Sequence, residues 1–306
     1  MGIDAIPEIC AQIGKIGEKE KEVDFLIVSQ GGDPIVPWRI IGLLRDRFEK
    51  ISVLIPYTAQ SAATILAFGA DEIVMHPYSC LGPIDAQITL PPSGQPSMTQ
   101  QFSVEDIKSY VDFIGEDLKI SNEDSGIESL KYLNEKLGPV TIGIVKRSMK
   151  LIDTLASKLL LLHMDDEEAV KKIVDNYNSL SGHGYTVSRR EALESGLPVV
   201  YGSKDLEKLM WSIWTDIESE MKCKDPFYPS KLLNENKEVV EKIKEGVRKG
   251  IVVSETITEV VPVAIVESNR LSSSFKVYTN ITASTVNTPN VMVSVDTVPV
   301  GWRQEC

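Results

Sequence analysis

The chain has 306 residues, which is enough for one large domain or for a main domain with an appendage. Hydrophobic residues make up 42% and charged residues 25%, a composition typical of folded globular proteins that excludes disorder of the whole chain. The 44 acidic residues outnumber the 32 basic ones, and a net charge of −12 repels the phosphates of nucleic acids. We therefore expect no nucleic acid as a partner.

The four cysteines are far apart in the sequence, and no Cys-x-x-Cys pair or cluster of histidines occurs. This pattern predicts no metal site and no disulfide framework, and it favours a reducing, cytoplasmic location. No apolar run reaches the length of about 18 residues that a membrane helix needs. The first residues also lack a basic segment followed by a long apolar one, so we expect neither a signal peptide nor a membrane span in this chain.

Strand and helix patterns alternate from the start of the chain to Met75. Helical patterns consist of apolar residues three and four positions apart, and strand patterns are short apolar runs that end at glycine or polar turns. Such alternation predicts parallel β/α units. The expected elements, in order, are a helix at 3–19, a strand at 23–29, a helix at 35–48, a strand at 51–56, a helix at 61–69 and a strand at 72–75.

Helical patterns dominate the middle of the chain, and the last part is different. From Gly250 onward, Val, Thr, Ile and Ser alternate without a helical period, which is typical of β structure. We expect a domain over 1–221 with a helical insertion at about 101–178, a helical connector over 222–250 and a β-rich segment over 251–306. Within these parts, helices are predicted at 104–118, 128–137, 142–162, 166–177, 188–196, 205–221 and 235–249.

Two turns follow consecutive strands of the expected sheet, and ligands bind at the carboxyl ends of parallel strands. Gly31 and Gly32 form the first turn, where the lack of a side chain lets backbone N–H groups approach a ligand, although a plain strand-to-helix turn uses glycine as well. Ser61 opens the alanine-rich helix after the second strand. Its hydroxyl is either a helix cap or a nucleophile whose oxyanion the N–H of Ala62 would stabilise.

The combination of motifs resembles a known family. The resemblance is carried by three segments, Gln30-Gly31-Gly32-Asp33, the run from Ser61 to Met75, and Leu81-Gly82-Pro83-Ile84-Asp85. Over about residues 3–215 the chain resembles the serine dehydrogenase proteinase family of the Clp protease/crotonase-like superfamily. This resemblance implies a Clp/crotonase-like α/β fold and a homo-oligomeric serine endopeptidase that acts on protein or peptide substrates without a cofactor. It also implies that Ser61 is the nucleophile and that Ala62 and the Gly31-Gly32 turn form the oxyanion hole.

The general base stays open at this point. Where Clp proteases keep the histidine of their triad, this chain has Asp85, and near the place of the Clp acid it has His183. One hypothesis is therefore a triad of Ser61, His183 and Asp85, with base and acid exchanged in chain order. The alternative base is Lys108, because related signal-peptide peptidases use a Ser–Lys dyad, but a solvated lysine beside Glu105 and Asp106 is the simpler explanation of this residue. His76, directly after a predicted strand, is a further candidate.

Two other functions share the expected fold. A crotonase-type enzyme would use the same two N–H groups to hold the enolate of an acyl-CoA thioester, but no phosphate-binding or pantetheine-binding motif is evident in the sequence. A non-catalytic oligomeric scaffold would keep the fold without the chemistry, and the missing Clp-type histidine favours that hypothesis. The sequence thus predicts a serine peptidase-like hydrolase with two alternatives.

Overall fold

A computed structural model describes residues 1–85, 87–90, 100–114, 127, 131–135, 137–180, 182, 184–224, 227–286 and 288–305. The chain forms two compact units. The first unit comprises Met1–Ile6 and Gly17–Trp211, and the second comprises Pro7–Ile16 and Ser212–Cys306. The three-part domain division expected from the sequence stays a prediction.

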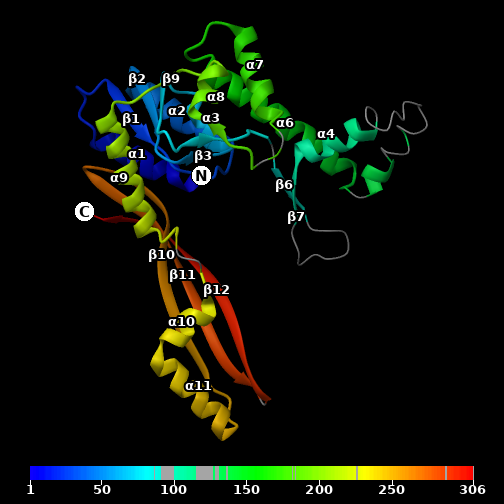
Figure 1. Ribbon diagram of the computed structural model, residues 1–306, viewed down its shortest axis with the longest axis vertical. Helices are drawn as coiled ribbons and strands as arrows, with labels where there is room; N and C mark the ends of the chain where they lie inside the picture. The colour runs from blue at the N-terminus through cyan, green and yellow to red at the C-terminus, as the bar shows by residue number, and fades with distance from the viewer. Residues whose placement is uncertain are drawn as a thin grey trace. The chain divides into compact units, whose positions relative to one another are not determined.

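A four-stranded parallel sheet lies at the centre of the first unit (Figure 1). Its strands, in spatial order, are β1 (Glu22–Leu26), β2 (Lys50–Ile55), β4 (Glu72–Met75) and β9 (Val199–Val200). The apolar residues of β2 and β4 are buried, since neighbouring strands and helices cover them. Because central strands of parallel sheets are covered on both faces, their sequences are nearly continuous apolar runs. The predicted parallel β/α units are confirmed.

The helices of the first unit follow the expected amphipathic patterns. α2 (Ile35–Arg47) and α3 (Ala62–Ala67) contact each other, and α6 (Pro139–Leu160) packs against both of them and against α7 (Glu167–Asn178). The carboxylate of Asp166 caps α7 by accepting hydrogen bonds from the N–H groups of its first turn. Figure 1 shows α6 and α7 as consecutive green helices.

A small second sheet of three two-residue strands lies in the same unit. β3 (Thr58–Ala59) pairs in parallel with β5 (Cys80–Leu81), which pairs antiparallel with β8 (Val187–Ser188). Ser188 caps α8 (Arg189–Glu194), as the capping box predicts: its hydroxyl accepts a hydrogen bond from the N–H of Glu191 at 3.3 Å. The sheet brings together the segments that precede Ser61 and Asp85.

The expected helical insertion also contains a pair of antiparallel strands, β6 (Gln87–Leu90) and β7 (Gln100–Ser103), before α4 (Val104–Asp112). The helix predicted at 104–118 is confirmed at its start, and its last residues lie outside the described ranges. Of the helix predicted at 128–137, residues 131–135 and 137 are helical.

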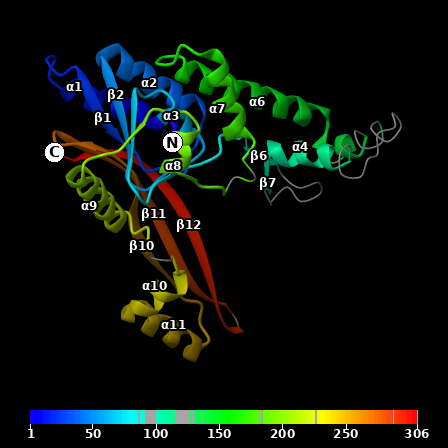
Figure 2. The same cartoon turned by 45° about the horizontal axis from the view of Figure 1, so that its top comes forward.

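The second unit is built on a long antiparallel sheet with the order β10-β11-β12. Its strands are β10 (Ser254–Ser268), β11 (Leu271–Val286) and β12 (Thr288–Glu305), which confirms the predicted β-rich segment. α10 (Pro229–Glu235) and α11 (Lys237–Lys249) lie against it (Figure 2). Leu233, Val239 and Ile243 of these helices form a core cluster with Ile281 and Ala283 of β11.

Two further helices complete the second unit. α1 (Ile6–Lys15) follows a short 3-10 turn at Ile3–Ala5, and all of its residues after Ile6 belong to the second unit. α9 (Lys204–Glu220) belongs to the first unit up to Trp211 and to the second unit from there on. The amide of Gln12 in α1 donates to the carbonyls of Val266 and Leu271 at 3.0 and 2.9 Å. These two hydrogen bonds hold α1 to the ends of β10 and β11.

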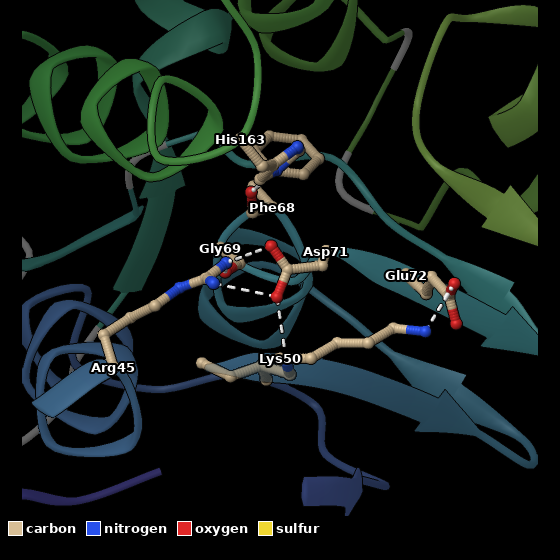
Figure 3. Close-up of polar contacts among 8 residues, drawn as sticks. Arg45, Lys50, Phe68, Gly69, Asp71, Glu72 and His163 are labelled. Carbon is tan, nitrogen blue, oxygen red and sulfur yellow. Dashed lines mark hydrogen bonds and ion pairs between the residues drawn. The ribbon is translucent and has the colours of Figure 1, made fainter. Parts of the chain in front are cut away.

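A polar cluster lies at the amino ends of β2 and β4 (Figure 3). Arg45 donates to both carboxylate oxygens of Asp71 at 2.8 and 2.9 Å, and Asp71 also accepts from the N–H of Ile51. Burial tends to raise the pKa of Asp71, but the hydrogen bonds from Arg45 and Ile51 outweigh burial and lower it. Nearby, Nε2 of His163 lies 2.8 Å from the carbonyl of Phe68. This cluster is structural and lies at the end of the sheet away from Ser61.

Candidate active site

Ser61 occupies a sharp turn between β3 and α3 with φ 51° and ψ −117°. Positive φ is rare for residues other than glycine. Within the described ranges, Lys222 is the only other non-glycine residue with a positive φ. Such a conformation costs on the order of 1–3 kcal/mol and persists where surrounding structure enforces it. The Ser61 hydroxyl makes no capping hydrogen bond to α3. Of the two interpretations of this serine, the helix cap therefore does not describe the structure.

The Gly31-Gly32 turn packs directly against the Ser61 turn. Gly31 has φ +107° and Gly32 has φ +140°, conformations that residues with a side chain adopt only at a cost. A Cβ atom on Gly31 would lie 2.9 Å from Cβ of Ser61 and 3.3 Å from the backbone nitrogen of Ala62. The absence of a side chain at Gly31 thus lets two turns that are far apart in the sequence come into contact.

The N–H groups of this junction differ in their partners. The N–H of Gly31 donates to Oγ of Ser29 at 3.0 Å. Ala62 is the first residue of α3, so its N–H has no acceptor within the helix. In the part of the chain that the structure describes, neither Ala62 nor Gly32 uses its N–H in a hydrogen bond. Within the described ranges, the N–H groups of Ala62 and Gly32 are therefore without an acceptor.

The backbone of Met1 lies beside the same turn. Its amine donates to the carbonyl of Gly31, and its carbonyl accepts from the N–H of Asp33 at 3.0 Å. A Cβ atom on Gly32 would overlap the Met1 backbone, with 2.2 Å to the Met1 carbonyl oxygen. The Met1 backbone therefore pairs with the residues on both sides of Gly32.

Asp85 is buried and follows a segment that is tied to α3. The hydroxyl of Thr64 in α3 donates to the carbonyl of Ala59 at 2.8 Å and accepts from the N–H of Gly82 at 3.1 Å. The N–H of Ile84 donates to the carbonyl of Tyr177 at 3.2 Å. These bonds fix the chain on both sides of Ser61 and just before Asp85.

Two of the candidate bases have side chains outside the described part of the chain. His183 lies outside the described residues. Lys108 lies within α4, and its side chain is not among the described ones. No described residue forms a hydrogen bond with the Ser61 hydroxyl. The site therefore brings together the predicted nucleophile and oxyanion-hole residues, while the choice between His183 and Lys108 stays a prediction.

His76 is enclosed by aromatic side chains at the end of β4. Its ring stacks on Trp211 with centroids 5.0 Å apart, and its Nδ1 accepts a hydrogen bond from the N–H of Tyr78 at 3.2 Å. Burial lowers the pKa of His76, and the charge of Glu207 opposes this effect only in part. His76 is thus a packed imidazole whose pKa lies below its usual value.

A pocket of about 560 Å³ opens beside these two turns. Its lining includes Gln30 and Gln60, which immediately precede Gly31 and Ser61, and the described residues of the lining are all uncharged. The other lining residues are Tyr57, Thr58, Pro77, Tyr78, Ser79, Cys80, Gly184, Thr186 and Ser188. No pattern in the sequence indicates this set, because the pocket is formed by short strands and loops that are far apart in the chain.

Searches for other kinds of site within the described ranges give no candidate. No group of three or more His, Cys, Asp or Glu side chains there is arranged to hold a metal ion. None of the helices in those ranges combines the length and the apolar composition that crossing a membrane requires. The contact between the Ser61 turn and the glycine turn is therefore the candidate active site.

Comparison with known proteins gives a family for the first third of the chain. Residues 1–112 match the family model described as ClpP-like SDH-type serine proteinase. Two proteins of Methanocaldococcus jannaschii are similar to this chain. Uncharacterized protein MJ1495 is 31% identical over 74 residues, 24% of this chain and 25% of that protein, and uncharacterized protein MJ0137 is 33% identical over 70 residues, 23% and 24%. The chain spans about a quarter of the length of these curated relatives. The match over residues 1–112 supports the family that the motifs in this part of the chain predict.

Proposed function

We propose that the chain is a serine peptidase-like hydrolase that cleaves protein or peptide substrates by acyl transfer through Ser61. The observation that carries this proposal is the strained conformation of Ser61 in direct contact with the glycine turn. A strained strand-to-helix turn exposes the hydroxyl of a nucleophilic serine and places a backbone N–H next to it. The family of residues 1–112 supports a serine peptidase-like function in general terms.

In the proposed reaction, Oγ of Ser61 attacks the carbonyl carbon of the scissile bond and forms a tetrahedral intermediate. The N–H of Ala62 and an N–H of the Gly31-Gly32 turn donate to the oxyanion of that intermediate. Fixed donors of this kind lower the barrier because charge develops on the oxygen in the transition state. The leaving amine departs, and water then hydrolyses the ester on Ser61.

For the proton of the Ser61 hydroxyl, we propose His183 as general base and Asp85 as the carboxylate that orients it. The pairing of β5 with β8 supports this choice, since Asp85 lies four residues after β5 and His183 four residues before β8 (85 − 81 and 187 − 183). In an antiparallel pair, such positions lie toward the same end of the two strands. Lys108 is the alternative base.

Labelling with a fluorophosphonate tests the nucleophile. We expect mass spectrometry to find the adduct on the peptide that contains Ser61 and to find none in a Ser61→Ala variant. Ser79→Ala is a matched control, because Ser79 lines the same pocket and its hydroxyl donates to the His76 carbonyl. Labelling of Ser61→Ala at the wild-type rate would rule out Ser61, and a folded wild-type protein without any label would favour the non-catalytic scaffold.

Two further points concern the acyl-CoA alternative and the oligomeric state. A crotonase-type enzyme needs cations for the phosphates of coenzyme A, and among the described residues that line the pocket beside Ser61 none is basic. This favours the peptidase over the acyl-CoA enzyme. We also propose a cytoplasmic homo-oligomer, so light scattering should give a mass well above the 33.9 kDa of one chain.

A further inference from the structure

Ser29 holds the glycine turn against the turn that carries Ser61. Its N–H donates to the carbonyl of Thr58 at 3.0 Å, and its carbonyl accepts from the N–H of Gln60 at 2.9 Å. Ser29 also forms a parallel bridge with Ala59. The backbone of Ser29 is therefore fixed to the residues that lead directly into Ser61.

The hydroxyl of Ser29 contacts both polar groups of Gly31. Its Oγ accepts from the N–H of Gly31 at 3.0 Å and lies 3.3 Å from the Gly31 carbonyl oxygen, to which it donates. Gly31 is buried and Gly32 is exposed. The Ser29 hydroxyl therefore contacts the peptide groups on both sides of the Gly31 α-carbon, and the Met1 amine is a second donor to the Gly31 carbonyl.

Because of this arrangement, the two glycines differ as possible N–H donors to an oxyanion. The N–H of Gly31 is occupied by Ser29. The peptide bond between Gly31 and Gly32 is trans, so the N–H of Gly32 points away from the Gly31 carbonyl that Ser29 holds. Across the described ranges, the N–H of Gly32 has no partner.

We propose that Ser29 is a positioning residue, whose hydroxyl orients the Gly31-Gly32 peptide so that Gly32, and not Gly31, donates its N–H to the oxyanion together with Ala62. This inference rests on the proposed function and adds a residue to it. Ser29 touches neither the substrate nor the reacting atoms, and it acts through the peptide group that it holds. Without its hydroxyl, glycine residues at φ +107° and +140° have wide conformational freedom.

The test compares Ser29→Ala with Ser29→Thr, which keeps a hydroxyl on Cβ. Removing one oxyanion donor costs on the order of 100- to 1,000-fold in kcat, and misplacing one costs less. We therefore expect Ser29→Ala to lower kcat on a casein-derived peptide pool about 10- to 100-fold, with KM within about twofold. Ser29→Thr should recover most of this loss.

A second readout separates positioning from a general loss of structure. A peptide aldehyde made from the fastest-cleaved peptide forms a tetrahedral adduct, and the matching peptide alcohol does not. For Ser29→Ala, the affinity for the aldehyde should fall by the same factor as kcat/KM, while the affinity for the alcohol should be unchanged. Urea unfolding establishes that the variant is folded, and amide hydrogen exchange should show that the N–H of Gly31 has lost its protection.

The outcomes distinguish this inference from the proposed function. Wild-type protein that labels at Ser61, combined with a Ser29→Ala variant that labels and turns over at the wild-type rate, would overturn the role of Ser29 alone. Equal weakening of aldehyde and alcohol binding, or no recovery in Ser29→Thr, would also overturn it. Failure of the wild-type protein to label at Ser61 would instead overturn the proposed function, and the role of Ser29 with it.

Discussion

Replacing Gly31 by alanine tests whether contact between the two turns creates the site. The new Cβ would lie 2.9 Å from Cβ of Ser61 and from the carbonyl oxygen of Gln60. Carbon atoms in contact are normally about 3.5–4.0 Å apart, so the two turns must separate by about 0.6 Å or more. Alanine must also adopt φ +107°. Backbone strain of about 1–3 kcal/mol and overpacking of about 1–3 kcal/mol together predict a loss of about 2–6 kcal/mol in the free energy of unfolding.

The chemical step should suffer beyond this loss of stability. A displacement of about 1 Å in a catalytic group can cost on the order of 100-fold in rate. We therefore expect the fraction of Gly31→Ala that remains folded to react with a fluorophosphonate about 100-fold more slowly than wild type. The assay combines urea unfolding, which gives the folded fraction, with the rate of Ser61 labelling measured by mass spectrometry.

Gly42→Ala is the matched control. Gly42 lies inside α2, and a Cβ atom there would meet no atom within 4 Å. Alanine in a helix interior is favoured over glycine by about 1 kcal/mol, so this variant should be as stable as wild type or more stable, with unchanged labelling. If Gly31→Ala matched wild type in both the urea midpoint and the labelling rate, the contact that we describe would have no bearing on the site.

Three further predictions concern the surroundings of the site. Thr64→Val removes the buried hydroxyl between α3 and Gly82 and should lower the free energy of unfolding by about 1–3 kcal/mol in urea, whereas Thr64→Ser should lose much less; equal losses would refute the role of the hydroxyl. The pKa of Asp71 is lowered in the folded chain, so its stabilising effect is present at neutral pH and is lost as the pH falls through that lowered pKa. Wild type should therefore exceed Asp71→Asn in stability by about 1–3 kcal/mol at neutral pH, and the difference should shrink in acid; a difference independent of pH would contradict this. His183→Ala and Asp85→Asn should each reduce peptide hydrolysis, His183→Ala by several orders of magnitude, while Lys108→Ala should not; the reverse result would assign a Ser–Lys dyad.

The sequence predicted the elements whose patterns are local. The apolar run of β2 and the helical spacing of α2 are visible because a buried parallel strand and an amphipathic helix repeat their side-chain environment every few residues. The caps at Asp166 and Ser188 follow the same logic, since a capping hydrogen bond spans only two or three residues. Strands of two residues, such as β3 and β9, are too short to show any period and were not predicted.

The same limit explains one difference among the helices. The helix predicted over 235–249 begins after Asn236, whose side chain accepts from the N–H of Val239, and a separate helix, α10, precedes it. Asn236 serves as the last residue of one element and the cap of the next. Helical propensity continues through such a position, and only the backbone conformation at Asn236 divides the two helices.

The candidate site shows what sequence alone determined about this protein and what required the tertiary structure. The sequence placed Gly31 and Ser61 at the ends of consecutive strands, where a parallel sheet collects its ligands. It left Ser61 with two interpretations, because a helix cap and a nucleophile need the same residue at the same position. In the structure Ser61 has φ 51° and makes no capping hydrogen bond, and Gly31 packs against it without a side chain, which excludes the helix cap and leaves the nucleophile as our proposal. Local hydrogen bonds and side-chain periods are encoded within a few residues, whereas contact between two distant turns arises only after the sheet has formed.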